Sequence, residues 1–244
     1  MIDLHAHILP RVDDGPPSTD DALEMARMAA AAGTTAMATT SHVGHVHGVA
    51  PEAIAGAREA LTAQLASEGI ELELLAGGEI AHDRLPDLDD HVLRTLALGG
   101  GSYVLLECPF SPIGDGLEPL VADLHERGFE VLLAHPERSA SLQHDPDLLA
   151  ALVDQGALAQ LTTGSLLGGF GPIAQQAAET MLRRGLVHVL ASDAHDAVHR
   201  PPVLDVQVGL EPAEHEWMTT TVPEAIVAGQ PVPPRPRVTS SSRR

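Results

Sequence analysis

The sequence lacks lysine, so all 14 basic residues are arginine, and 34 acidic residues bring the formal net charge to −20. Such a charge argues against nucleic acid or anionic lipid as the main partner. The only cysteine, Cys108, excludes an internal disulfide. The sequence contains no apolar run of 18 residues, which excludes a transmembrane helix, and no signal peptide pattern. We therefore expect a cytoplasmic protein.

Aromatic residues are also scarce, at 2% of the 244 residues, although 44% of the chain is hydrophobic. Alanine, leucine, valine and isoleucine must therefore fill the core, and the length suits one large domain. We expect this domain to span residues 1–230. The Pro/Arg/Ser-rich segment 231–244 offers little to bury, so we expect it to be disordered.

Seven short apolar stretches alternate with helical stretches at a spacing of about 25–35 residues, which is typical of βαβ units. This alternation predicts a parallel sheet, either open or closed into a barrel. The expected strands cover residues 1–7, 34–39, 71–76, 102–106, 130–133, 158–161 and 187–191. The expected helices lie near residues 18–33, 51–69, 90–96, 117–127, 146–155, 172–184, 212–218 and 223–228.

Side chains that can bind a metal follow six of the seven expected strands. In a parallel barrel all strand C-termini share one rim, whereas the outermost strand ends of an open sheet lie too far apart to meet. The pattern therefore favours an α/β fold closed into a barrel, with the site at the C-terminal rim. These residues are His5, His7, His42, Glu79, Glu107, His135, Asp193 and His195.

The candidate ligands are imidazoles and carboxylates without thiolates, a set that suits Mn²⁺, Fe²⁺ or Zn²⁺ in a catalytic site. Eight residues exceed the need of one ion, so we expect two or three ions that share a carboxylate. Such clusters activate water and stabilise phosphoryl displacement. Taken singly, each residue has an ordinary alternative as a core histidine or a loop charge. Their joint placement at strand ends favours a metal cluster.

Other candidates have simpler interpretations. A cysteine phosphatase needs an arginine six residues after its nucleophile, and Gly114 occupies that position after Cys108, so a thiolate mechanism is rejected. His45 and His47 are expected to be exposed loop residues, with extra metal ligands as the alternative. His188 is expected in the core, whereas surface positions are expected for His82, His91, His125, His144, His199 and His215. His199, next to Arg200, has substrate contact as its alternative role.

Several motifs resemble a known family in sequence order. They are Met1–His7, Val12–Pro16, Thr40–His42, Gly77–Ile80, Glu107, Ala134–Arg138, Gly164–Gly168, Ala191–His195, Arg200–Pro202 and Pro223–Ile226. Together they resemble the PHP (polymerase and histidinol phosphatase) superfamily, and within it the bacterial manganese-dependent protein-tyrosine phosphatases of capsule and exopolysaccharide loci.

The resemblance implies a distorted seven-stranded β/α barrel that holds three metal ions, with Mn²⁺ as the first choice. It implies one ion on His5, His7, Glu79 and Asp193, a second on Glu79, Glu107 and His135, and a third on Asp14, His42 and His195. Asp13, next to Asp14, is the alternative ligand at that position. The resemblance also implies that Arg138 and Arg200 bind the substrate phosphate, as guanidinium groups can do with two hydrogen bonds each.

The expected reaction is hydrolysis of a phosphomonoester by a metal-bridging hydroxide, with Asp193 and His195 as candidate proton shuttles. The expected substrate is a phosphotyrosine protein, by resemblance the tail of an autophosphorylated bacterial tyrosine kinase. One alternative is a phosphatase for histidinol phosphate or another small phosphomonoester. A second alternative is a non-catalytic metal-binding regulatory module.

Overall fold

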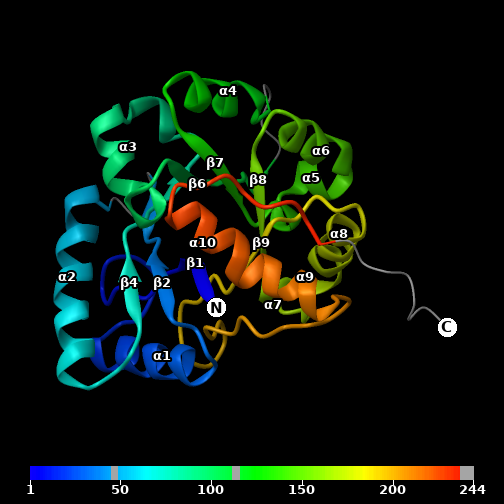
Figure 1. Cartoon of the computed structure of the whole chain (residues 1–244). Helices are drawn as coiled ribbons and strands as arrows, with labels where there is room; N and C mark the ends of the chain where they lie inside the picture. Colours follow the sequence, from blue (N-terminus) through cyan, green and yellow to red (C-terminus); the bar gives the residue numbers. More distant parts are fainter. Residues whose placement is uncertain (45–48, 112–115, 237–244) are drawn as a thin grey trace.

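The computed structural model describes residues 1–44, 49–111 and 116–236, in which parallel strands are surrounded by helices (Figure 1). A strand is present at each of the seven predicted positions. These strands are β1 (Ile2–Ala6), β2 (Ala36–Thr39), β4 (Glu73–Leu75), β6 (Tyr103–Glu107), β7 (Glu130–Ala134), β8 (Leu158–Thr162) and β9 (Val189–Ala191). Two short strands were not predicted, namely β3 (His42–Val43) and β5 (Glu79–Ala81).

Helices also occupy all the predicted positions, and their ends follow ordinary capping chemistry. The Ser18 side chain accepts a hydrogen bond from the Asp21 backbone N–H, and the Asp89 side chain accepts one from the Val92 N–H. The predicted helices are α1 (Thr19–Ala31), α2 (Pro51–Ser67), α3 (Asp90–Leu96), α4 (Glu118–Glu126), α6 (Pro146–Asp154), α8 (Gly171–Arg183), α9 (Pro212–Glu216) and α10 (Val222–Val227). The sequence analysis missed the short helices α5 (Ala140–His144) and α7 (Thr163–Leu166).

The hydrogen-bonded strands form two parallel sheets, with the orders β1-β2-β4 and β3-β5-β6-β7-β8-β9. The chain leaves the first sheet after β2 and again after β4, and each time it joins the second sheet one short turn later. Gly78 lies in the second of these breaks, where a Cβ atom would approach Leu96 Cδ2 to 2.6 Å. One continuous closed ladder of seven strands is therefore not found among the described residues.

The two sheets meet where β1 and β9 end. The His7 N–H donates to the Ala194 carbonyl and the Asp193 N–H donates to the His5 carbonyl, each at 2.8 Å, around an isolated bridge between Ala6 and Ala194. This contact joins the first and the last strand of the chain. It places residues from both ends of the sequence at one rim.

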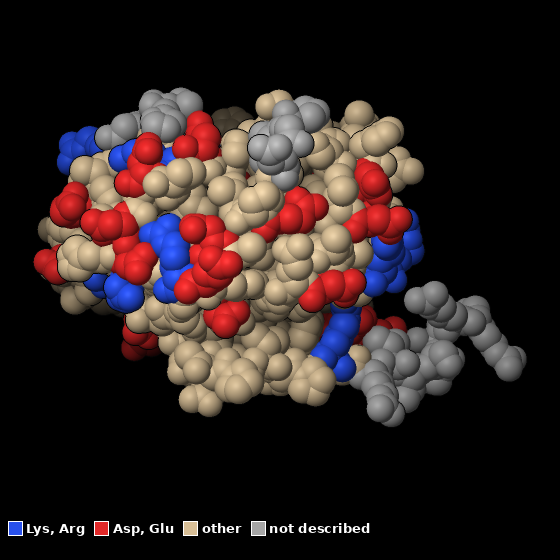
Figure 2. All heavy atoms as spheres, turned by 90° about the horizontal axis from the view of Figure 1, so that it is seen from above, with Lys and Arg blue, Asp and Glu red and all other residues tan. Residues whose placement is uncertain are grey.

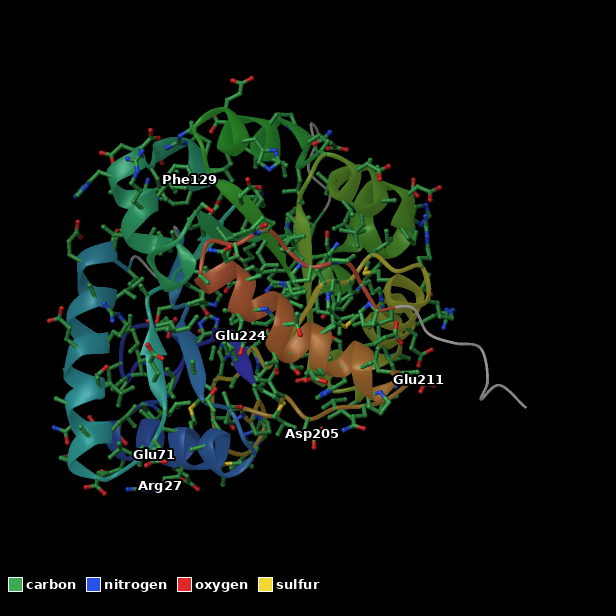
Figure 3. The ribbon with its side chains drawn as sticks, viewed as in Figure 1. Arg27, Glu71, Phe129, Asp205, Glu211 and Glu224 are labelled. Atoms are coloured by element: carbon green, nitrogen blue, oxygen red, sulfur yellow. The ribbon has the colours of Figure 1, made fainter. Side chains whose placement is uncertain are left out.

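Aliphatic side chains fill the core, as the scarcity of aromatic residues requires. Phe129 is buried near α3 and α4, beneath the guanidinium group of Arg94 at 5.6 Å (Figure 3). Trp217, in the π-helical turn Trp217–Thr221, donates a hydrogen bond of 3.0 Å to the Pro233 carbonyl. His215 is buried and its Nε2 lies 3.1 Å from the Leu204 carbonyl, so its predicted surface position is wrong.

The C-terminal segment differs from the expectation of disorder in the part that is described, residues 231–236. Val232 packs against the core, and Arg235 forms an ion pair of 3.1 Å with Glu214. The cause is local, because the buried indole N–H of Trp217 needs an acceptor and the carbonyl of Pro233 supplies it. Residues 237–244 lie outside the described residues.

Acidic side chains are spread over the face seen in Figure 2, with arginines between them. Among the exposed ion pairs, Arg27 of α1 binds Glu68 at the end of α2 at 2.8 Å. Figure 3 labels Arg27. In the described parts of the chain, no helix combines the length and the hydropathy needed to cross a membrane.

The packing of the strands predicts a large effect of a cavity in β7. Leu133 has no exposed surface. Leu133→Ala should lower the free energy of unfolding by about 3 kcal/mol, because it removes buried methyl groups that the surrounding helices and strands cannot replace. Urea denaturation of the metal-free protein measures this loss. Leu148→Ala, at a position that is 38% exposed, is the control and should cost less than about 1 kcal/mol. Equal losses would contradict the assignment of Leu133 to the core.

Candidate metal centre

The nine residues expected to bind metal come together at the C-terminal rim of the strands. They form four overlapping groups, and in each group one ligand atom per residue lies within 4.8 Å of all the others. The groups are His5, His7 and Asp193; His5, Glu79 and His135; His42, Glu79 and Glu107; and His7, Asp14, His42 and His195. Asp14, His42 and His195 fall in one group as expected, and so do His5, His7 and Asp193. Glu79 is not in the group of Asp193, and Glu107 and His135 fall in different groups, so the groups differ from the expected ligand sets.

The innermost site lies between β1, β5 and the residues after β9. The Nε2 atoms of His5 and His7 are 3.2 Å apart. The same atoms lie 3.4 and 3.3 Å from Oε2 of Glu79, and 3.5 and 3.6 Å from Oδ1 of Asp193. Four ligand atoms at roughly 2.1 Å from one cation in a tetrahedral arrangement are roughly 3.4 Å from each other. The spacing of the His5, His7 and Asp193 atoms therefore fits a divalent cation, and Glu79 lies at a similar distance from both histidines but outside the group that contains Asp193.

Glu79 connects the groups, because its two oxygens face different histidines. Its Oε1 lies 2.8 Å from Nε2 of His135, and its Oε2 lies 3.0 Å from Nδ1 of His42. A buried carboxylate with ligands on both sides is suited to bridge two cations. Glu79 sits at the first position of β5, where the short strand aligns it with Leu105 of β6.

Asp13 and Asp14, the two alternative ligands at this position, have different surroundings. Asp14 Oδ1 lies 3.5 Å from His42 Nε2 and 3.4 Å from His195 Nε2, within a candidate metal group. Asp13 instead holds the loop, since its Oδ2 accepts hydrogen bonds of 2.9 Å from His7 Nδ1 and from the His42 N–H. Asp13 also accepts a bond from the N–H of Gly15. A Cβ atom on Gly15 would lie 2.3 Å from the His7 carbonyl oxygen, so the turn requires glycine.

Three histidines are oriented by acceptors on their Nδ1 atoms. His7 has the Asp13 carboxylate, His195 has the Asp193 carbonyl at 3.0 Å, and His5 has the side-chain oxygen of Gln160 at 3.0 Å. The Gln160 oxygen also accepts from the His135 N–H at 3.2 Å. When neutral, these rings keep their proton on Nδ1 and present the lone pair of Nε2 to the centre of the site.

Three supporting residues were not predicted from the sequence, namely Gln160, Asp3 and Glu137. Asp3 is fully buried, and it accepts bonds from the Ser192 hydroxyl at 2.5 Å and the Ser192 N–H at 3.1 Å. Glu137 is fully buried as well, and its Oε1 accepts from the Ser165 hydroxyl at 2.7 Å and the Thr162 N–H at 3.1 Å. A polar residue inside an otherwise apolar strand was the available signal for Asp3 and Gln160.

Burial and charge shift the pKa values of the site in opposite directions. Burial by itself lowers the pKa of His7, but the hydrogen bonds to Asp13 and Glu79 raise it to about 10. Burial likewise raises the pKa of Glu79, yet the surrounding imidazoles, His5 first, hold it well below its usual range. Burial and the neighbouring Glu79 charge raise the pKa of Glu107 to about 7. The raised pKa of His7 thus favours its protonated ring next to the ionised carboxylate of Glu79.

Two of the candidate ligands have left-handed backbone conformations that residues other than glycine rarely adopt. His135 has φ of 35° and Asp193 has φ of 51°, and each directly follows or closely follows a strand. Such conformations persist only where the surroundings fix them. At Asp193 the N–H bond to His5 and two arginines supply that restraint.

Arg138 and Arg200 converge on the same carboxylate oxygen. Their guanidinium groups donate to Oδ2 of Asp193 at 2.7 and 2.6 Å. Both arginines line a cavity of about 440 Å³, whose other lining residues include Asp14, His42, Glu79, Glu107, Phe110 and His135. The cavity therefore joins cation-binding side chains to two groups that bind oxyanions.

His82, His199 and Cys108, the other candidates from the sequence, lie outside the four candidate metal groups of the described residues. His82 lines the cavity, whereas the His199 side chain is 86% exposed. Cys108 has no exposed surface, and burial raises the pKa of its thiol well above the usual value, which agrees with the rejection of a thiolate mechanism. His45 and His47 lie outside the described residues.

The chain thus belongs to the class of parallel α/β proteins that gather imidazoles and carboxylates able to hold metal at one rim. The family model for capsular polysaccharide synthesis, CpsB/CapC, matches residues 1–211, and the chain belongs to this family. This finding confirms the predicted resemblance to proteins of capsule loci.

The named relatives agree with this assignment. Tyrosine-protein phosphatase YwqE of Bacillus subtilis (strain 168) is 35% identical over 247 residues, which cover 97% of this chain and 96% of YwqE. The putative tyrosine-protein phosphatase CapC of Staphylococcus aureus is 33% identical over 210 residues, covering 84% of this chain and 80% of CapC. A crystal structure from work on YwqE and Streptococcus pneumoniae CpsB, described as metal-dependent tyrosine phosphatases, superposes with a TM-score of 0.84. It shares 33% identity and covers 98% of this chain and 100% of that one.

The position of Asp13 behind His7 predicts that it tunes metal affinity. Asp13→Ala should weaken Mn²⁺ binding by roughly 10–100-fold, because His7 loses the acceptor that fixes its ring and tautomer. Isothermal titration calorimetry measures this change. Asp20→Ala, an exposed acid in the first turn of α1, is the control and should leave the affinity unaltered. An Asp13→Ala protein that binds Mn²⁺ like the wild type would contradict this role.

The raised pKa of His7 predicts how the metal-free protein responds to pH. The folded value of about 10 exceeds the ordinary value of 6.5, so this group contributes stability that is complete below pH 6.5. The contribution should fall as pH rises from 6.5 to 10. Urea denaturation of chelator-treated protein at pH 6.5, 8 and 9.5 measures the loss. In His7→Gln this part of the pH dependence should vanish, and an unchanged slope would refute the assignment.

Proposed function

We propose that this protein is a metal-dependent protein-tyrosine phosphatase. The observation that carries the proposal is the convergence of nine candidate ligands at one rim, where six of them and two arginines line a cavity of about 440 Å³. The relatives named as tyrosine-protein phosphatases support it along nearly the whole chain. A non-catalytic metal-binding module needs neither the cavity nor the paired arginines.

We assign the metal ligands as His5, His7, Asp14, His42, Glu79, Glu107, His135, Asp193 and His195. These nitrogen and oxygen donors suit two or three Mn²⁺ ions, and they would also accept Fe²⁺ or Zn²⁺. Bound ions of this kind lower the pKa of a coordinated water and neutralise charge on phosphoryl oxygens. The chain contributes the spacing of the donors, and Asp13 and Gln160 contribute the orientation of His7 and His5.

Arg138 and Arg200 would donate hydrogen bonds to the substrate phosphate. In the structure both donate to Asp193 Oδ2, so they already point toward the centre of the metal groups. A phosphate oxygen that replaces this contact would receive two charge-assisted hydrogen bonds. As ligands, Asp193 and His195 have little freedom to act as bases. A tyrosine phenolate, with a pKa of about 10, leaves without strong acid catalysis.

We also propose that the two sheets act as one distorted seven-stranded barrel. The backbone hydrogen bonds of His7 and Asp193 join the ends of β1 and β9, and they support closure of the barrel at the rim. The family's role in capsular polysaccharide synthesis supports an autophosphorylated bacterial tyrosine kinase as the partner protein. Its phosphotyrosine tail would enter from the cavity side of the rim.

The decisive experiment compares two substrates on the purified Mn²⁺-loaded protein. A phosphotyrosine peptide should be hydrolysed with higher kcat/KM than histidinol phosphate, and a chelator should abolish the activity until Mn²⁺ is restored. Arg138→Ala should raise KM at least tenfold, because a charge-assisted contact to the phosphate is lost. Metal analysis of the same samples gives the number of ions per chain.

Arg58→Ala, on helix α2 and outside the cavity lining, provides the matched control and should keep wild-type kinetics. Higher efficiency on histidinol phosphate would assign the protein to small phosphomonoesters. Absence of any phosphate release from p-nitrophenyl phosphate with the metals bound would exclude a phosphatase.

A further inference from the structure

The five aromatic residues of this chain are distributed unevenly around the cavity. Phe129 and Trp217 are buried away from it, and Phe129 lies beside α3 and α4 (Figure 3). Phe110, which follows β6, lines the cavity and is 50% exposed. It is the only aromatic residue among the large exposed hydrophobic side chains of the described residues. A ligand that covers the exposed half of this ring would gain the free energy of burying apolar surface.

The ring of Phe110 is held in a defined position by two site residues. It stacks on the imidazole of His135 with an interplanar angle of 13° and a centroid distance of 5.6 Å. The guanidinium carbon of Arg138 lies 4.9 Å from its centroid. Packing against two anchored groups fixes the ring while half of its surface faces solvent.

Phe170 offers an internal comparison, because it touches the same arginines from a different place. The guanidinium carbon of Arg138 lies 4.3 Å from the Phe170 centroid and that of Arg200 lies 5.5 Å from it. Phe170 lines a separate small pocket of about 200 Å³ and does not line the metal cavity. Phe170 packs on the two arginines, whereas Phe110 also exposes part of its ring to a ligand in the cavity.

We propose that Phe110 is a specificity-determining residue that stacks on the aryl group of the substrate. The inference rests on the proposed phosphatase function and deepens it. With the phosphate between Arg138 and Arg200, the ester group must extend along the cavity wall that Phe110 forms. A flat ring can share the face of Phe110 in offset or edge-to-face geometry, which an alkyl chain cannot do. The cavity would therefore select aryl over alkyl phosphomonoesters.

The test measures binding of two phosphonates to the full-length, Mn²⁺-loaded protein by calorimetry, without any need for turnover. The wild type should bind phenylphosphonate more tightly than methylphosphonate. Phe110→Leu keeps an apolar side chain but removes the ring, and it should lower this preference about fivefold, the effect of one aromatic contact. Phe110→Trp should retain the preference. Phe170→Leu should weaken both ligands by the same factor, since it acts on the arginines.

A wild type without preference for the phenyl ligand would overturn the inference, and so would a Phe110→Leu protein that keeps the preference. Equal weakening of both phosphonates in Phe110→Leu would also overturn it, because Phe110 would then only position Arg138. Thermal melting confirms that each variant is folded. Failure of the proposed function is separate, since it would appear as bound phenylphosphonate without hydrolysis of a phosphotyrosine peptide.

Discussion

The carboxylates of Glu79 and Asp193 lie almost completely buried among imidazole rings, and the arrangement of the whole rim depends on them. Each ring nitrogen of His5 and His7 that points inward lies within 3.6 Å of an oxygen of these two residues. Ionised carboxylates at such depth are costly unless opposite charge surrounds them. Arg138 and Arg200 supply that charge at Asp193, and the His7 imidazole, whose pKa is raised, supplies it at Glu79. A cation that binds between these carboxylates would displace the proton of His7.

A layer of supporting residues keeps this assembly in place. Asp3 ties the first strand to Ser192, which directly precedes Asp193, and Glu137 ties the loop of Arg138 to β8 and α7. Burial raises the pKa of Asp3 to about 6, against the hydrogen bonds from Ser192 that lower it. These residues touch no substrate in the proposed function. They hold the segments next to His135 and Asp193, whose left-handed backbone conformations persist only where the surroundings fix them.

The sequence predicted the strands and helices well because their signals are local, namely β-branched runs, capping residues and closing glycines. It also predicted that eight of the candidate ligands would lie close together, since they follow expected strands and parallel strands end on one side, whereas Asp14 was expected only from the family resemblance. The split into two sheets was not predicted, and at one of its two breaks Gly78 packs closely on Leu96, a residue of another element that the local sequence does not reveal as its neighbour. The role of Gln160 was hidden for a similar reason. Its partners, His5 and His135, lie 155 and 25 residues away, and only the register of the strands brings them together.

The excess of acidic residues over the surface has a kinetic consequence. A phosphoester that carries two negative charges approaches a protein of net charge −20, so the long-range field opposes the encounter even though the cavity itself attracts oxyanions. Dissolved ions shorten the reach of that field to about 8 Å at physiological ionic strength, and less at higher salt. Adding salt therefore speeds the diffusional approach of an anionic substrate to this protein, the reverse of the behaviour of enzymes whose surfaces steer their substrates inward. A substrate segment with basic residues around its phosphate would gain from the same field.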